Sequence, residues 1–248
     1  MSVEEDTGHP TTKQRGRGGS PVGALLKMTQ IETKLLLRDP ATAIMVVALP
    51  LFLMTIFSLM PGFNEPFDGF GGESVVDTFI PGVTTVVVLS VLGLSVMPVY
   101  LATYRERGVL RRLAVSPASP WLLLAAQLLV NAMLAIAGVA LMTLFAALFL
   151  DVSPPGNPGG FALAFLLATS TALAIGTLIG SLASNSKSAT AIGLAVLFPL
   201  LFLAGVWSPV DMLPGTLSTI GAATPLGAGL AAIRATWAGA PRSQYTCC

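Results

Sequence analysis

Five long apolar segments without a charged side chain constrain the fold of this chain more than any other feature. The segments are Ala41–Met60, Thr78–Leu101, Trp121–Leu150, Phe161–Ala183 and Ala189–Trp207. Each is close to the ~20 residues that an α-helix needs to cross the hydrocarbon core of a bilayer. Only 10% of the residues are charged, whereas a soluble domain has roughly a quarter. We therefore predict an all-α integral membrane protein with five transmembrane helices.

Residues 21–39, ahead of the first apolar segment, predict a helix of a different kind. Lys27, Lys34 and Arg38 share one stripe at helical spacing, and most of the large apolar side chains fall on the other side. This pattern is typical of an amphipathic helix that lies in the membrane interface with its basic groups toward anionic headgroups. Asp39 and Pro40 then have the pattern of an N-cap and a first-turn proline.

Two polar tails flank this helix and the membrane domain, which we place at residues 40–240. Residues 1–20 are polar and glycine-rich and lack the apolar stretch of a signal peptide, so we expect a disordered cytoplasmic tail. Residues 241–248 form the second tail, which contains Cys247 and Cys248. Adjacent terminal cysteines form neither a disulfide framework nor a zinc site. The two cysteines either have no role or are a lipidation signal.

The distribution of Lys and Arg predicts the orientation of the chain. Basic residues precede the first apolar segment and also lie between the second and third (Arg105, Arg107, Arg111 and Arg112) and between the fourth and fifth (Lys187). The other connections carry only acidic charges, namely Glu65, Asp68, Glu73, Asp77, Asp151 and Asp211. Because Lys and Arg are retained on the cytoplasmic side, we expect a multi-pass membrane protein with a cytoplasmic N-terminus.

Several kinds of chemistry are missing from the sequence. The apolar segments contain no ionisable side chain, and such residues normally form the proton relays and ion-coupled sites of pumps. The chain has no GxxxxGK[ST] phosphate loop, no HExxH and no GxSxG. We therefore expect no enzyme, no metal site, no cofactor bound by this chain and no nucleic-acid partner. Energy for uphill transport would have to come from another subunit.

The connection between the second and third apolar segments, Tyr104–Pro120, is the best candidate for contact with such a subunit. As a helix, it would place its arginines on one face and Val109, Leu110 and Leu113 on the other. Glu106 falls on the apolar side without a cation at i+3 or i+4, so we expect it to be half-buried and to need a partner. That partner would be Lys27, Lys34 or Arg38, or a residue of a second protein. The alternative is an ordinary basic loop with a short interfacial helix.

This connection resembles the coupling segment of the type-2 ABC exporter permeases, whose usual run is Arg-Glu-x-Gly-Thr-Leu-x-x-Leu-x-x-Thr-Pro-x-Ser. The matching residues are Arg105, Glu106, Gly108, Leu110, Leu113, Pro117 and Ser119. A second match runs from Phe202 to Pro209 and resembles the end of the family's fifth span. Thr224-Pro225-Leu226 and Ile233-Arg234 resemble the family's Asn-Pro-Leu and the Leu-Arg before its sixth span. The resemblance covers residues 22–238.

The resemblance implies a permease of six spans that dimerises with a second copy or a paralogue. It also implies two copies of a separate ABC ATP-binding subunit, which would hold ATP and Mg²⁺, and export of a drug, lipid or polysaccharide-like amphipathic compound. The chain resembles permeases of the drug-resistance type in particular, which implies a place in the bacterial plasma membrane. The residues expected to couple to the ATP-binding subunit are Arg105, Glu106, Gly108, Leu110, Arg112, Leu113 and Pro117. The sequence departs from the family after Gly239, where a sixth span is expected and residues 241–248 are polar.

A non-transporting membrane protein, such as an immunity or assembly factor that binds partners, is the alternative function. Within the spans, Gln127 and Asn131 are four residues apart and face the same way on one helix. They either bind helices together or line a substrate path. Gly176 and Gly180 form a GxxxG pattern that permits close helix packing, including packing within one monomer.

Overall fold

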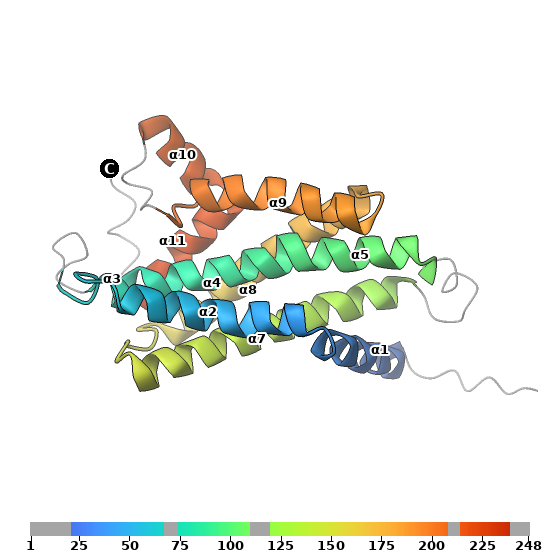
Figure 1. Cartoon of the computed structure of the whole chain (residues 1–248), viewed down its shortest axis with the longest axis horizontal. Helices are drawn as coiled ribbons and strands as arrows, with labels where there is room; N and C mark the ends of the chain where they lie inside the picture. Colours follow the sequence, from blue (N-terminus) through green and yellow to red (C-terminus); the bar gives the residue numbers. More distant parts are fainter. Residues whose placement is uncertain (1–20, 67–73, 110–119, 208–213, 239–248) are drawn as a thin grey trace, which may run out of the picture.

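The structure is a computed structural model that describes residues 21–66, 74–109, 120–207 and 214–238. Within these ranges the chain forms helices and no strand (Figure 1). The helices are α1 (Pro21–Leu37), α2 (Pro40–Ser58), α3 (Val75–Thr78), α4 (Ile80–Ser90), the π-helix η2 (Val91–Val96), α5 (Met97–Glu106), α7 (Pro120–Phe149), α8 (Pro158–Leu182), α9 (Ser186–Leu203), α10 (Gly215–Ala223) and α11 (Pro225–Trp237). The prediction of an all-α membrane protein is confirmed.

Four helical stretches of the described chain are long and apolar enough to cross a membrane. They are Val75–Glu106, Trp121–Phe149, Pro158–Leu182 and Ser186–Leu203, which correspond to the second to fifth predicted segments. The first predicted segment corresponds to α2, of which the Ile44–Ser58 part forms a shorter apolar helix. Pro40 lies in the first turn of α2 and Asp39 is its N-cap residue, as predicted, although the Asp39 side chain makes no capping hydrogen bond.

The stretch from α4 through η2 to α5 runs through the middle of the bundle, and most of it is buried (Figure 1). At η2, the neighbouring helices have glycines at the points of contact, and the absence of a side chain lets the helix backbones lie close together. A Cβ atom on Gly176 of α8 would overlap the carbonyl oxygen of Gly93, and one on Gly193 of α9 would overlap that of Leu94. The GxxxG face of α8 therefore packs within the monomer, with Gly180 against Pro98 and Leu101 of α5.

α10 and α11 are two helices joined by a sharp bend, in the region where the sequence shows no evident sixth span. Their axes differ by 83°, so the pair is either one broken span or a re-entrant loop. The break follows from Thr224, which caps α11 by accepting the Gly227 N–H, and from Pro225 in the first turn. α11 buries Leu230, Ile233 and Trp237, and it packs against α8 and α4.

The helix expected in the membrane interface is present as α1, which packs against α7 and α2. Lys27, Lys34 and Arg38 are exposed, as the stripe predicts. Ile31 and Leu35 are also exposed, which leaves apolar surface for contact with lipid. The side of α1 that faces the bundle buries Leu36 and also an acidic residue, Glu32.

We expect Gly176→Ala to lower the free energy of unfolding by about 1–3 kcal/mol, because the added methyl group must displace the backbone of η2. Thermal unfolding of the detergent-solubilised protein would measure this loss. Gly215→Ala is the matched control, since a Cβ at Gly215 meets no atom within 4 Å. Equal melting temperatures for the two variants would contradict the packing described for η2.

Candidate functional site

One end of the bundle contains most of the basic side chains of the described chain, and we call it the basic end. It comprises α1, the C-terminus of α5, the start of α7 and the turn from α8 to α9 (Figure 1). Its basic residues are Lys27, Lys34, Arg38, Arg105, Arg107 and Lys187. The segment that resembles the coupling segment begins here, at the end of α5.

Tyr104 connects α5 to α1 and α7. Its hydroxyl donates a hydrogen bond of 2.6 Å to Oε2 of Glu32, which is only 5% exposed. Gln127 of α7 donates from Nε2 to the same carboxylate oxygen and also to the Tyr104 hydroxyl oxygen. Asn131, one turn further along α7, donates to the Gln127 backbone carbonyl at 2.9 Å. These side chains form a buried polar cluster among three helices.

The environment of Gln127 and Asn131 favours the role of binding helices together over that of lining a substrate path. Both side chains are buried, and they face the same way, as predicted. Neither lines the large groove described below. Burial in the polar cluster also raises the pKa of the Glu32 carboxyl, and the hydrogen bond from Tyr104 opposes this shift.

Arg105 connects α5 to the end of α8. Its Nη1 lies 3.2 Å from the carbonyl oxygen of Gly180, 2.6 Å from that of Ser181 and 3.2 Å from that of Ala183. The last carbonyls of a helix lack intrahelical partners and carry partial negative charge. A guanidinium group at this position therefore supplies both hydrogen bonds and charge to the C-terminus of α8.

Glu106 connects α5 to the start of α9, and here the sequence prediction was wrong. We expected a half-buried carboxylate whose partner would be Lys27, Lys34 or Arg38, or a residue of a second protein. The side chain is instead exposed, and the Ser186 backbone N–H donates to Oε1 at 3.1 Å. Ser186 is the first residue of α9, after the N-cap Asn185. The N–H groups of a first turn lack intrahelical acceptors and attract anions. Within the described chain, a helix terminus therefore binds Glu106 in place of a basic side chain of residues 27–38.

Gly108 follows the end of α5 with a φ angle of +65°, a left-handed conformation that favours glycine. The chain therefore leaves the axis of α5 directly after the contacts of residues 104–106. The other residues that the resemblance assigns to coupling, Leu110, Arg112, Leu113 and Pro117, lie outside the described residues.

Glu32 is the residue of this end that the sequence analysis missed. It is the one acidic side chain in residues 21–38, a segment whose other charges are basic. The sequence contained one signal for Glu32, namely that it is a single acidic residue in an otherwise basic helix. Its partners could not have been identified, because Tyr104 and Gln127 are 72 and 95 residues away in the sequence.

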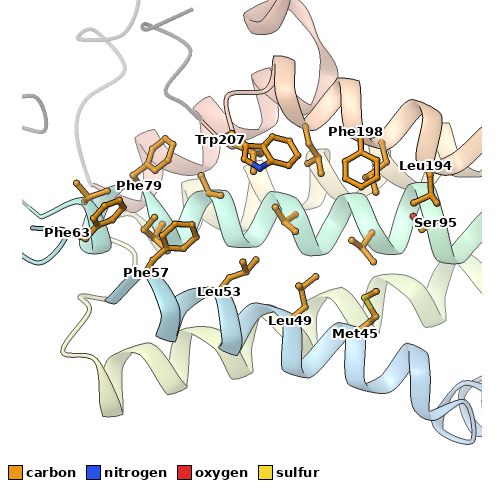
Figure 2. Close-up of a pocket in the computed structure, with 18 of the residues that line it drawn as sticks. Met45, Leu49, Leu53, Phe57, Phe63, Phe79, Ser95, Leu194, Phe198 and Trp207 are labelled. Atoms are coloured by element: carbon orange, nitrogen blue, oxygen red, sulfur yellow. The ribbon is translucent and has the colours of Figure 1, made fainter. Parts of the chain in front are cut away.

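A separate apolar groove of about 900 Å³ lies between α2, the α4–η2 stretch and α9. Figure 2 shows Met45, Leu49 and Leu53 on one side and Leu194 and Phe198 on the other. None of the described residues that line it is charged. Ser95 of η2 contributes a hydroxyl, and its Oγ has no hydrogen-bond partner among the described residues.

A second hollow of about 530 Å³ lies at the basic end, between the junction of α1 and α2 and the side of α5. It shares Met45, Val91 and Ser95 with the apolar groove, so the two hollows adjoin. Unlike the groove, it has charged residues in its lining, Asp39 and Arg107, and it has further hydroxyl-bearing residues, among them Thr42 and Tyr100. Among the described residues, no three His, Cys, Asp or Glu side chains gather as a metal site.

The arrangement of spans, basic end and groove agrees with a comparison against known families. The sequence profile of the ABC-2 type transporter family matches residues 24–237. The chain belongs to the ABC-2 type transporter family. A member of this family is a permease component of an ABC transporter, so the chain is a multi-pass membrane protein of a transport system.

The match covers every helix from α2 to α11 and nearly all of α1. The basic end and the groove are therefore both parts of the ABC-2 membrane domain. A comparison with curated proteins found no significant match.

We expect Glu32→Leu to lower the free energy of unfolding by about 1–3 kcal/mol, because the buried donors of Tyr104 and Gln127 lose their shared acceptor. Glu32→Gln is the matched variant, since its side-chain carbonyl still accepts both hydrogen bonds without a buried charge. It should melt at or above the wild-type temperature. Thermal unfolding in detergent measures both, and wild-type stability of Glu32→Leu would argue against the buried cluster.

Proposed function

We propose that this chain is the membrane subunit of an ATP-driven exporter and that a separate ABC ATP-binding subunit acts on its basic end. ATP and Mg²⁺ bind to that partner, and this chain binds no cofactor. The active assembly contains a second permease copy or a paralogue in the plasma membrane of a bacterium. The basic end faces the cytoplasm, in agreement with the retention of Lys and Arg on that side.

The observation that carries the proposal is the set of contacts made by residues 104–106. Tyr104 contacts α1 and α7, Arg105 contacts the end of α8, and Glu106 contacts the start of α9. A partner that moves the segment after Gly108 would pull on the last turn of α5. Because that turn is bonded to four other helices, the whole basic end would move with it.

The α4–η2–α5 stretch connects this movement to the groove. Its residues Val83, Val87 and Val91 line one wall, and α9 forms another. Both elements end at residues that bond to each other, Glu106 and Ser186. A shift of α5 relative to α9 would therefore change the width of the groove. The π-helical turns of η2 provide a place where the α4–η2–α5 stretch can deform, since π-bulges are frequent at functional sites.

The lining of the groove supports a drug-like or lipid-like cargo over a polysaccharide. A sugar chain presents many hydroxyl groups, and each one that loses water without a new partner costs free energy. The lining of the groove is mostly apolar, and its polar side-chain groups are the Ser95 hydroxyl and the Trp207 indole N–H. Resistance to an apolar drug would be one consequence of such transport.

The test is co-purification from native membranes in mild detergent, followed by measurement of substrate-stimulated ATP hydrolysis. An ATP-binding subunit should co-purify with the wild-type chain. Glu106→Ala removes an exposed side chain, so folding should be retained, but stimulation should fall about fivefold or more, the lower range for coupling between sites. Glu65→Ala, an exposed acid in the connection after α2, is the matched control and should behave as wild type.

Two results would count against the proposal. If the wild-type chain brings down no ATP-binding subunit, the non-transporting, partner-binding alternative is favoured. If Glu106→Ala retains full stimulation, the contact between α5 and α9 has no part in coupling.

A further inference from the structure

We propose that the exposed face of α1 binds the head groups of anionic phospholipids, and that this contact holds the last turn of α5 in place. The face consists of basic and apolar side chains, namely Leu26, Lys27, Ile31, Lys34, Leu35 and Arg38. The inference rests on the proposed export function, and it deepens that function by naming a class of lipid that regulates coupling at the basic end.

The separation of charge around α1 is the first argument. At about 100° per residue, Lys34 and Arg38 lie within roughly 20° of Lys27 around the helix axis, and all three side chains are exposed. Glu32, the one acidic residue of α1, lies roughly 140° from Lys27 and is buried against the bundle. The exposed face of α1 therefore carries positive charge, which attracts the phosphates of an anionic leaflet.

The apolar side chains of this face are the second argument, and they favour a lipid over a soluble protein. Ile31 and Leu35 border the basic stripe on one side and Leu26 borders it on the other, and all three are exposed. In the head-group layer, apolar side chains of this kind reach the acyl chains while the basic groups meet the phosphates. A cytoplasmic partner would have to cover the apolar borders as well as the charges.

The short link between α1 and α2 is the third argument. α1 ends at Leu37 and the apolar helix α2 begins at Pro40, so at ~3.5 Å per residue the two ends are within roughly 11 Å of each other. The link keeps α1 at the level where α2 enters the membrane. Its acid, Asp39, accepts hydrogen bonds from Thr42 and Tyr100 and therefore belongs to the contacts of α2 and α5.

The opposite face of α1 carries the effect of the lipid to the last turn of α5. Glu32 accepts hydrogen bonds from the Tyr104 hydroxyl and from Gln127 of α7, and Tyr104 lies two residues before Glu106. α1 and the last turn of α5 lie at the same end of the bundle (Figure 1). If α1 left the membrane surface, the buried donors of Tyr104 and Gln127 would lose their shared acceptor.

The two faces of α1 are therefore linked thermodynamically. A lipid that binds α1 more tightly when Glu32 holds Tyr104 stabilises that arrangement by the difference between its two affinities. Each Lys or Arg near an anionic leaflet strengthens such a contact about fivefold. A neutral membrane would provide less of this stabilisation, so the last turn of α5 would open more often.

The experiment is hydrogen–deuterium exchange of the full-length chain in two kinds of nanodisc. One kind contains phosphatidylcholine alone, and the other contains an equal amount of phosphatidylglycerol as well. Phosphatidylglycerol should slow the exchange of α1 amides about fivefold or more, and it should also slow the exchange of the last turn of α5. Glycerol phosphate dissolved around the neutral nanodiscs should change neither rate, which distinguishes a lipid surface from a free anion.

Two kinds of variant separate the lipid contact from its transmission. The double variant Lys27→Gln/Lys34→Gln should lose most of the slowing caused by phosphatidylglycerol. Its matched control, Lys13→Gln/Lys187→Gln, removes the same charge from positions outside α1 and should retain most of it. Tyr104→Phe should keep the slowing in α1 and lose it in the last turn of α5, because the hydroxyl that reaches Glu32 is absent.

Exchange that is equal in the two nanodiscs would overturn the inference. So would equal slowing by dissolved glycerol phosphate, or equal losses in the α1 double variant and its matched control. Slowing of α1 exchange by the ATP-binding subunit, with no effect of phosphatidylglycerol, would show that the face binds that subunit instead.

The lipid effect is measured without the ATP-binding subunit, so the inference and the proposed function fail separately. Co-purification of that subunit together with no effect of phosphatidylglycerol would overturn the lipid contact alone. A phosphatidylglycerol effect without a co-purifying ATP-binding subunit would support the lipid contact and count against the exporter.

Discussion

The close contact of η2 with α8 and α9 is the constraint on which the other features of this bundle depend. Gly176 and Gly193 let two helices rest against the carbonyl groups of Gly93 and Leu94. Within a bilayer, such approach of small residues supplies much of the packing energy between helices. It sets the spacing of α8 and α9 from the central stretch, and therefore decides where their ends lie relative to the end of α5.

That spacing explains why residues 104–106 reach so many helices. Arg105 meets the last carbonyls of α8, and Glu106 meets the first N–H of α9, because the turn between those helices lies beside the last turn of α5. Both contacts use helix termini, which present partial charges and unpaired backbone groups. The proposed coupling thus depends on general properties of helix ends, together with the buried acceptor that Glu32 provides to Tyr104.

Particular residues show how far sequence reasoning reaches. The second to fifth apolar segments were predicted correctly, because length and lack of charge suffice to identify a spanning helix. Gln127 and Asn131 were correctly placed on one face, since that follows from helical periodicity. Glu106 was predicted half-buried from the pattern of its own helix, and this was wrong because its partner is the backbone of a helix 80 residues away.

The sequence by itself determined the class of protein, the approximate positions of its four long apolar helices, and the collection of positive charge between particular spans. These are properties of composition and local periodicity, which the bilayer enforces directly. The tertiary structure alone decided the fold of α10 and α11, the burial of Glu32, and the joining of an apolar groove to a hollow with Asp39 in its wall. Each of those features depends on which helices lie side by side, and the packing of distant segments is not encoded in any local pattern.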